Sequence, residues 1–292
     1  MKTYLKYLVV IFFAMLSACK KDSIPVASDP VADAYVRTDN TSSEIDHQIY
    51  LVYQQTQIPI LYTDTLRKNP LQVINLNYEM AGSNSSYTYT YPKNKADILT
   101  GIAFVRDKIL PPLGPNIKIH SLILLDTLKI VQVYGPTYSI TTNYNVIPAL
   151  TTFGIANIPR IATMTSVELA TYKADIFTNL LINPLTSSTL LADFYKVSSG
   201  FYSGYAYLGA TSSYYLPFKD KREYGFILDG TESPYYFTTP DEAGDVKLFL
   251  SNILTMSAAD FQTLNGNYPL VMNKYNLLKT ALTTLGFDLT KV

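Results

Sequence analysis

The sequence is poor in the residues that most catalytic and metal-binding sites use. Its 292 residues include one cysteine, Cys19, two histidines, His47 and His120, and no tryptophan. Beyond Cys19, the chain can therefore form no disulfide, no thiol nucleophile and no cysteine-ligated metal site. The 23 basic and 23 acidic side chains cancel. This balance argues against nucleic acid as a partner, because phosphate binding needs a basic surface.

Long apolar runs are also scarce, and the one at the N-terminus has the order of an export signal. Lys2 and Lys6 precede an apolar stretch at residues 8–16, and small residues follow it. The stretch is shorter than the ~20 residues that a membrane-spanning helix needs. An uncleaved membrane helix is the alternative interpretation.

The residues after this stretch predict a lipid anchor. The motif Leu16-Ser17-Ala18-Cys19 resembles the lipobox of bacterial lipoproteins, which implies cleavage before Cys19 and lipidation of that residue. The lipid would tether the protein to a membrane from outside the cytoplasm. Lys20-Lys21-Asp22 resembles the start of outer-membrane lipoproteins, often surface-exposed, of Bacteroidota-type bacteria.

Composition then predicts three segments. Residues 1–18 are the predicted signal peptide. Residues 19–41 are polar, contain Pro25 and Pro30, and are predicted to form a flexible tether. Residues 42–292 have the length of one large domain or two small ones, and a single domain with a sizeable core is the interpretation adopted.

The pattern of apolar residues predicts strands and two helices in the first half of this domain. Residues 95–110 are predicted to form a helix that ends at Pro111 and Pro112. A turn is expected at residues 81–86 within an extended stretch, because Gly, Ser and Asn gather there. The other expected elements are a helix at 43–55 and strands at 58–62, 72–91, 117–125, 128–134 and 148–156.

The second half is predicted to be mainly helical. Thr165 and Glu168 fit a capping box that opens a helix running to about Ile182, where Pro184 is expected to stop it. Further helices are predicted from 239–242, from 257–260 and over 269–285, and a Tyr- and Gly-rich loop over 200–218. Strands followed by helices predict an α+β fold, in contrast to alternating βαβ units.

The order of these elements resembles the substrate import-associated zinc metallohydrolase lipoproteins, a metallopeptidase family. The resemblance implies a zincin-like scaffold, with a mixed sheet in the N-terminal half and a mainly helical C-terminal half. It also implies partnership with a TonB-dependent transporter and a SusD-like lipoprotein, whose genes tend to lie beside those of the family. The matching segments are 45–50, 58–62, 109–125, 223–226, 233–235, 240–242 and 285–289.

The family's metal-binding helix carries H-E-x-x-H, which places two imidazoles one turn apart and a Glu beside the zinc-bound water. In this sequence the resemblance places Thr178 and Ile182 at the histidine positions and Asn179 at the Glu position. Leu248 falls at the third ligand position. The resemblance therefore implies no zinc, no other cofactor and no metallopeptidase activity. A site formed by His47, His120 and a carboxylate is the remaining alternative.

Other reactive groups are few. Asp241, Glu242 and Asp245 are interpreted as acids that favour the positive end of a helix dipole, although a catalytic carboxylate pair is the alternative. The sequence has no G-x-S-x-G elbow and no phosphate-binding glycine loop.

Aromatic residues are the best candidates for a binding site, because the chain has 25 tyrosines. A tyrosine ring packs on its faces and hydrogen-bonds at its tip, so it suits a glycan or peptide ligand. Ordinary packing of a Tyr-rich loop is the alternative. One cluster is Tyr87, Tyr89 and Tyr91, and the other, which would border the former zinc cleft, is Phe201, Tyr202, Tyr205, Tyr207, Tyr214 and Tyr215.

Together these observations predict an outer-membrane lipoprotein that is a catalytically inactive relative of zinc metallopeptidases. Its expected role is that of an accessory binding or scaffold subunit in a TonB-dependent import system for glycans or peptides. Two alternatives stay open: an active hydrolase whose catalytic residues are unrecognised, and a structural lipoprotein of the cell envelope.

Overall fold

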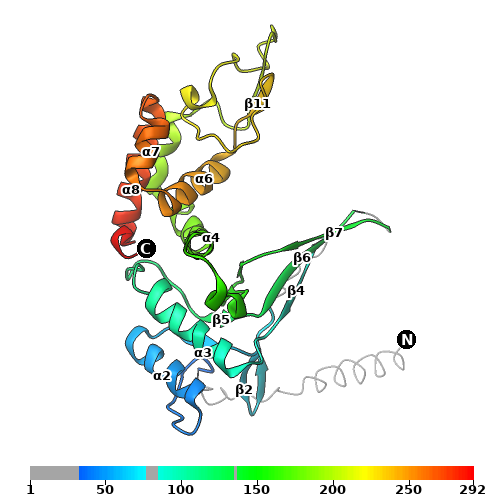
Figure 1. Ribbon diagram of the computed structural model, residues 1–292, viewed down its shortest axis with the longest axis vertical. Helices are drawn as coiled ribbons and strands as arrows, with labels where there is room; N and C mark the ends of the chain where they lie inside the picture. Colours follow the sequence, from blue (N-terminus) through cyan, green and yellow to red (C-terminus); the bar gives the residue numbers. More distant parts are fainter. Residues whose placement is uncertain (1–32, 77–84, 135–136) are drawn as a thin grey trace, which may run out of the picture. The chain divides into compact units, whose positions relative to one another are not determined.

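The computed structural model describes residues 33–76, 85–134 and 137–292 (Figure 1). The chain falls into two compact units, residues 1–36 and 37–292, and the elements below belong to the second. The predicted signal peptide, Cys19 and most of the predicted tether lie outside the described residues. So does most of the turn expected at 81–86, of which residues 85 and 86 begin a strand.

The structure confirms the mixed α+β class. A four-stranded sheet has the order β1 (Ile60–Leu61), β5 (Leu122–Leu124), β9 (Phe153–Ile155) and β8 (Val146–Pro148). The first three strands run parallel, and β8 is antiparallel to β9. All three residues of β5 are fully buried, as expected of a parallel strand covered on both faces.

A second sheet is antiparallel and extends away from the core. It has the order β4 (Ser85–Thr90), β6 (Thr127–Val133) and β7 (Ser139–Asn143), and Figure 1 shows it as a long ribbon. Every residue of β7 is exposed. A separate hairpin pairs β2 (Thr65–Lys68) with β3 (Leu71–Val73).

Several predicted strands differ from the observed ones, because pairing partners set strand length. Of the stretch expected at 72–91, the described residues pair only in β3 and β4. The strand expected at 117–125 is reduced to β5, since β1 and β9 reach only residues 122–124. The strand expected at 148–156 is two strands. A turn in which the Ala149 amide donates to the Thr152 carbonyl (3.2 Å) reverses the chain between β8 and β9.

The helices follow the predicted order closely. The predicted helix at 95–110 is α3 (Lys95–Phe104), continued by a π-helical turn, Val105–Ile109. The others are α2 (Glu44–Thr56), α4 (Ser166–Thr186), α5 (Ala192–Val197), α6 (Glu242–Thr255), α7 (Ala258–Asn265) and α8 (Pro269–Leu285), with short 3-10 turns at Ile158–Thr163, Thr189–Leu191, Lys221–Tyr224 and Leu289–Lys291.

Of the two predicted capping boxes, the one at the start of α4 is confirmed and the one at the start of α6 is wrong. At α4, the Thr165 amide donates to Glu168 Oε2 (2.8 Å) and the Glu168 amide to Thr165 Oγ1 (3.2 Å), which is the predicted capping box. The box predicted at 239–242 is wrong. Asp241 caps α6 by accepting from the Gly244 amide (2.7 Å), because the Thr239 hydroxyl is used elsewhere, on the Phe201 carbonyl.

Pro184 does not stop α4, which continues to Thr186. A proline inside a helix loses one backbone hydrogen bond and crowds the carbonyl four residues earlier. Here it lies in the last turn of α4. The prediction of an end at Ile182 was therefore wrong by one turn.

One apolar core joins these elements. Helix α4 packs against α6 and α8, and α2 packs against α3. Phe177 of α4 meets Phe287 beyond α8 with ring centroids 5.2 Å apart. Both residues belong to the main buried cluster, which extends from α2 to the C-terminal residues.

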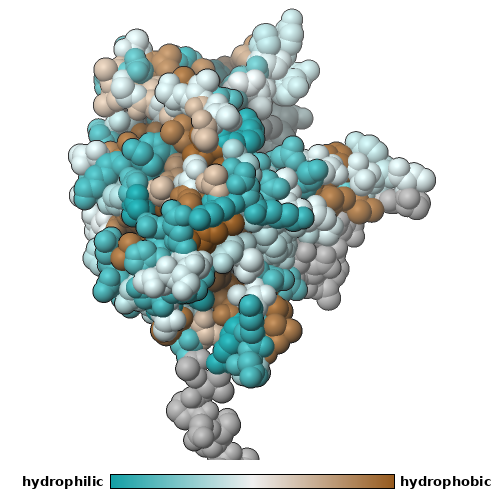
Figure 2. Space-filling model, turned by 60° about the horizontal axis from the view of Figure 1, so that its bottom comes forward, coloured by the Kyte–Doolittle hydropathy of each residue, from teal (hydrophilic) through white to brown (hydrophobic). Residues whose placement is uncertain are grey.

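No helix among the described residues is long and apolar enough to cross a membrane. Figure 2 shows one face of the molecule, where hydrophobic side chains reach the surface in patches between hydrophilic ones.

Candidate functional site

The helix expected to carry degenerate zinc positions is α4, and its side chains there are used for packing. Thr178 and Ile182 are buried, each 8% exposed. The Asn179 amide donates to the carbonyl and side chain of Asp175 (2.9 and 3.0 Å), one turn earlier on the same helix. Leu248 of α6 is partly buried. An apolar chain and a neutral amide cannot hold Zn²⁺ and activate its water.

The two histidines lie in separate segments of the described chain. His47 on α2 is hydrogen-bonded through Nδ1 to Asp39 (2.7 Å). His120 is exposed and precedes β5, outside the strand where it was predicted. Within residues 33–76, 85–134 and 137–292, no three His, Cys, Asp or Glu side chains are grouped so that they could hold a metal ion.

Asp245 lies in the first turn of α6, as interpreted from the sequence, but it is not at the surface with the other two acids. Its side chain is fully buried and contacts the ammonium of Lys274 from α8, which is also fully buried. Asp241 and Glu242 do lie exposed at the start of α6, as predicted. The fold brings α8 against α6 and places a counter-ion beside Asp245, which no local pattern reveals.

Aromatic rings and two hydroxyls surround this pair. The Lys274 ammonium lies 4.5 Å from the ring centre of Phe194 and 4.6 Å from that of Phe226. It donates to Ser198 Oγ (2.8 Å), and Tyr202 donates to Asp245 Oδ2 (2.9 Å). Such contacts partly replace the water that the two charges lose on burial.

Burial is the largest influence on both groups. It raises the pKa of Asp245 and lowers the pKa of Lys274, against the attraction between their opposite charges. The pKa of Tyr202 is also raised, chiefly by burial and next by the negative charge of the neighbouring Asp245 carboxylate. The pair is neutral overall whether the proton lies on nitrogen or oxygen, so it can remain in an apolar interior.

Tyr202 therefore does not lie with the other tyrosines of its predicted cluster. Its hydroxyl points to Asp245, and its ring packs edge-on against Phe226 with centroids 5.4 Å apart. With Phe201, Leu216 and Phe218 it lines a small second core of Ala206, Tyr224, Phe226 and Phe237. Its role is to connect this second core to the Lys274–Asp245 pair.

The remaining tyrosines come together on a surface above the second core. The segment expected to be a loop contains β10 (Tyr205–Tyr207), which pairs antiparallel with β11 (Tyr236–Thr238). Tyr207 lies opposite Tyr236, so both rings are on one face. Ala206 and Phe237 are on the other face, and they are buried.

A third segment completes this surface. Leu216 forms a parallel bridge with Ala206, and its amide donates to the Tyr205 carbonyl (2.7 Å). Tyr214 and Tyr215 precede Leu216, and their rings contact those of Tyr205 and Tyr207. We call the five exposed rings the tyrosine platform, and β11 is labelled in Figure 1. Its members are Tyr205, Tyr207, Tyr214, Tyr215 and Tyr236, between 39% and 71% exposed.

Rings of the platform contact one another. Tyr205 and Tyr214 are nearly parallel, with an angle of 15° between ring planes and centroids 6.3 Å apart. Tyr207 and Tyr215 are 6.4 Å apart, and Tyr214 meets Tyr215 edge-on at 5.2 Å. Contiguity distinguishes this surface from single exposed aromatics, which need no explanation.

The other predicted aromatic cluster has a structural role. Tyr89 of β4 packs edge-on against Tyr91 at 5.8 Å, and its hydroxyl accepts from the Leu76 amide (3.3 Å). Burial is the largest cause of the raised pKa of Tyr91. These rings, partly buried, hold β4 in place and do not form an open surface.

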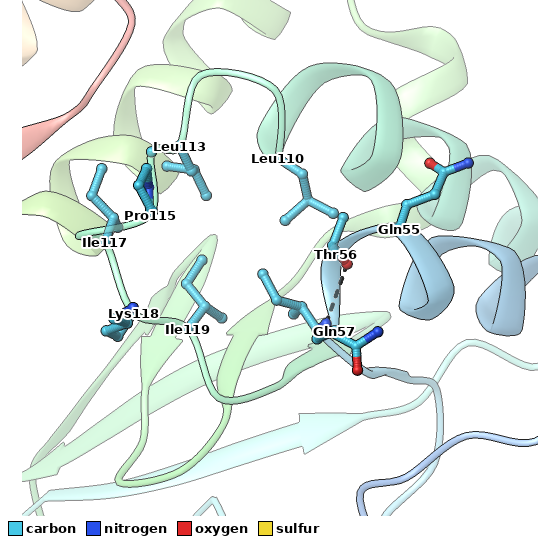
Figure 3. Close-up of a pocket in the computed structure, with 11 residues that line it drawn as sticks. Gln55, Thr56, Gln57, Leu110, Leu113, Pro115, Ile117, Lys118 and Ile119 are labelled. Carbon is cyan, nitrogen blue, oxygen red and sulfur yellow. Dashed lines mark hydrogen bonds between the residues drawn. The ribbon is translucent and has the colours of Figure 1, made fainter.

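A cavity of about 460 Å³ lies where α2 ends beside the segment 110–119 (Figure 3). Leu110, Leu113 and Ile119 point into it, whereas Gln55 points away. Binding sites usually add several convergent polar groups to an apolar lining. This mainly aliphatic cavity is therefore a weaker candidate than the tyrosine platform.

No family model matches the chain, and neither a curated protein nor a solved structure matches it. The resemblance to the zinc metallohydrolase lipoproteins therefore stays a prediction.

Proposed function

We propose that this protein is an outer-membrane lipoprotein that binds a ligand for a TonB-dependent import system and catalyses no reaction itself. Its scaffold is zincin-like, with the metal-binding positions replaced. The lipobox ending at Cys19 supports the anchor, and the family resemblance supports the scaffold and its partnership with a transporter and a SusD-like lipoprotein. On which side of the outer membrane the protein faces is part of the test below.

The observation that carries the binding role is the tyrosine platform. Four rings in contact with one another, joined by Tyr236 opposite Tyr207, are each at least 39% exposed and face away from a small second core. Aromatic side chains at the surface lose apolar hydration when a ligand covers them. Their exposure in a contiguous group is typical of binding surfaces.

The inactive role is supported by what replaces the zinc positions. Thr178 and Ile182 contribute to the packing of α4, and Asn179 is hydrogen-bonded along its own helix. An amide cannot accept a proton from water as the family's Glu does. A catalytic zinc site needs three protein ligands and one open position, and these three side chains supply none.

The test uses mature lipidated protein extracted from cell envelopes. We expect it to fractionate with the outer membrane, to co-purify with a TonB-dependent transporter, and to contain far less than one zinc per chain. Replacing Cys19 with Ser should release it from the membrane fraction. Stoichiometric zinc together with peptidase activity that a chelator removes would contradict the proposal. Protease treatment of intact cells reports which side of the membrane the domain faces.

A further inference from the structure

We infer that the tyrosine platform is a binding site for a neutral glycan, whose sugar rings stack on Tyr205, Tyr207, Tyr214 and Tyr215. This inference rests on the proposed function and names the class of ligand that its binding site takes. It is argued from the arrangement of the rings, from their support, and from the charge of the segments that carry them.

The arrangement of the rings suits the flat apolar faces of sugars. Tyr205 and Tyr214 differ by 15° in ring plane, and their centroids are 6.3 Å apart. Tyr207 and Tyr215 form a second pair, 6.4 Å apart and inclined to each other by 49°. The C–H face of a hexose covers one such ring while its hydroxyls reach past the ring edge. Two neighbouring pairs therefore suit an oligomer better than a single sugar.

The platform is supported before any ligand arrives. Its three segments are joined by the pairing of β10 with β11 and by the Ala206–Leu216 bridge. Beneath them, the second core is connected through Tyr202 to the buried Lys274–Asp245 pair. Rigid tyrosines bind with little loss of conformational entropy, and preorganisation of this kind raises affinity.

The charge of the surrounding sequence favours a neutral ligand. No Asp, Glu, Lys or Arg occurs from residue 198 to residue 218, or from residue 233 to residue 240. A charged ligand would lose hydration on this surface without an opposite charge in return. The Thr238 hydroxyl, on the residue paired opposite Tyr205, can instead hydrogen-bond to sugar hydroxyls.

The same features disfavour a peptide. A peptide that joins a sheet needs a strand with a free edge. Among the described residues, β10 offers none, because it is paired with β11 and bridged to Leu216, whereas β11 is paired with β10 alone. The absence of charge is therefore the stronger argument. Peptides also carry charged ends and charged side chains, which this surface does not match.

The experiment is affinity electrophoresis of the mature full-length lipoprotein in detergent, through gels that contain one polysaccharide each. The neutral probes are amylopectin, laminarin, galactomannan and arabinoxylan. The anionic probes are polygalacturonate and chondroitin sulfate, and a tryptic digest of casein tests peptides by competition and by calorimetry. The variants are Tyr205→Ala/Tyr214→Ala and Tyr207→Ala/Tyr215→Ala.

The matched control is Tyr134→Ala/Tyr138→Ala. This pair is similarly exposed, at 58% and 59%, and its ring centroids are 5.9 Å apart, but Tyr134 follows the end of β6 and Tyr138 precedes β7. Thermal unfolding by circular dichroism checks that each variant is folded. We expect at least one neutral polysaccharide to retard the wild type and the control. Each platform variant should weaken that binding by about tenfold or more, as loss of stacked rings does elsewhere.

Two results would overturn the inference. One is that no neutral polysaccharide binds, or that folded platform variants bind as the wild type does. The other is that the platform variants abolish binding of the casein peptides or of an anionic polysaccharide instead. That second result would leave the proposed binding function intact. Stoichiometric zinc with hydrolysis of a probe would overturn the proposed function itself.

Discussion

Lys274 is a charged residue whose burial is tolerated only because of the residues around it. Its ammonium and the Asp245 carboxylate are both fully buried and in contact. Removing one partner of such a pair leaves the other buried without compensation, which typically costs more than replacing both. The pair also connects α6 and α8 to the second core through Tyr202. We therefore expect its loss to change the structure of the tyrosine platform as well.

We predict that Lys274→Met lowers the free energy of unfolding by about 3–5 kcal/mol. The double variant Lys274→Met/Asp245→Leu should recover most of this loss, because neither charge remains in the interior. Urea unfolding followed by far-ultraviolet circular dichroism measures the change. Lys196→Met is the control, since its ion pair with Asp193 is exposed, at 74% and 71%, and should contribute little. Equal destabilisation by the single and double variants would contradict the prediction.

At the scale of an element, α4 is the clearest case in which local sequence sets structure. Thr165 and Glu168 satisfy amides of its first turn, which have no partner inside the helix. The helix then runs to Thr186 with Pro184 in its last turn. Its beginning is thus set by four consecutive residues, whereas its end lies beyond the proline that the local sequence predicts as the stop.

We predict that Thr165→Ala destabilises the protein by about 1 kcal/mol, because the amide of Glu168 loses its acceptor. Thr171→Ala on the exposed side of the same helix is the control. The Thr171 hydroxyl only donates to the carbonyl one turn back (3.0 Å), and alanine favours helix more than threonine does. The control should therefore be neutral or slightly stabilising in the same urea titration. A loss no larger at Thr165 than at Thr171 would refute the role of the cap.

At the scale of the whole described domain, two distant glycines meet. Gly286 ends α8 with φ +93°, the left-handed conformation that glycine accepts readily. Beside it, a Cβ added to Gly114 would lie 2.2 Å from the Gly286 carbonyl oxygen. The Asp288 amide also donates to the Pro112 carbonyl (2.9 Å). The C-terminal helix is therefore joined to the segment that follows α3.

We predict that Gly114→Ala lowers the free energy of unfolding by about 3 kcal/mol, the upper end for overpacking, because the obstructing atom is backbone and cannot rotate away. Gly200→Ala is the control. Its φ of +85° is unfavourable for alanine, but nothing lies within 4 Å of the added Cβ, so only about 1 kcal/mol of backbone strain is expected. Both are measured by thermal and urea unfolding. Equal losses would show that the close approach of the two segments is not rigid.

Local patterns in the sequence were enough for the α+β class, for α2, α3 and α8, and for the start of α4. In each case the deciding interactions join residues within one or two turns of each other. The tyrosine cluster was also visible in the sequence, and four of its members, Tyr205, Tyr207, Tyr214 and Tyr215, do share one surface.

Features that depend on distant partners could not be predicted in this way. The sequence alone did not show Tyr236 joining the platform, because its neighbour Tyr207 is 29 positions earlier (236 − 207 = 29) and meets it only through strand pairing. It did not show that the Tyr202 hydroxyl donates to Asp245, so that Tyr202 lies apart from the other tyrosines of the cluster. Strand lengths in the main sheet likewise follow from the short neighbour β1.

By itself, the sequence determined where α4 begins, where charge is absent and which residue types are present to bind a ligand, since these depend on near neighbours and on composition. Only the tertiary structure decided that Asp245 is buried against Lys274, that α4 continues past Pro184, and that five tyrosines share one exposed face. Burial and long-range contact are properties of the packed chain, and solvation energy changes with them far more than local conformation does.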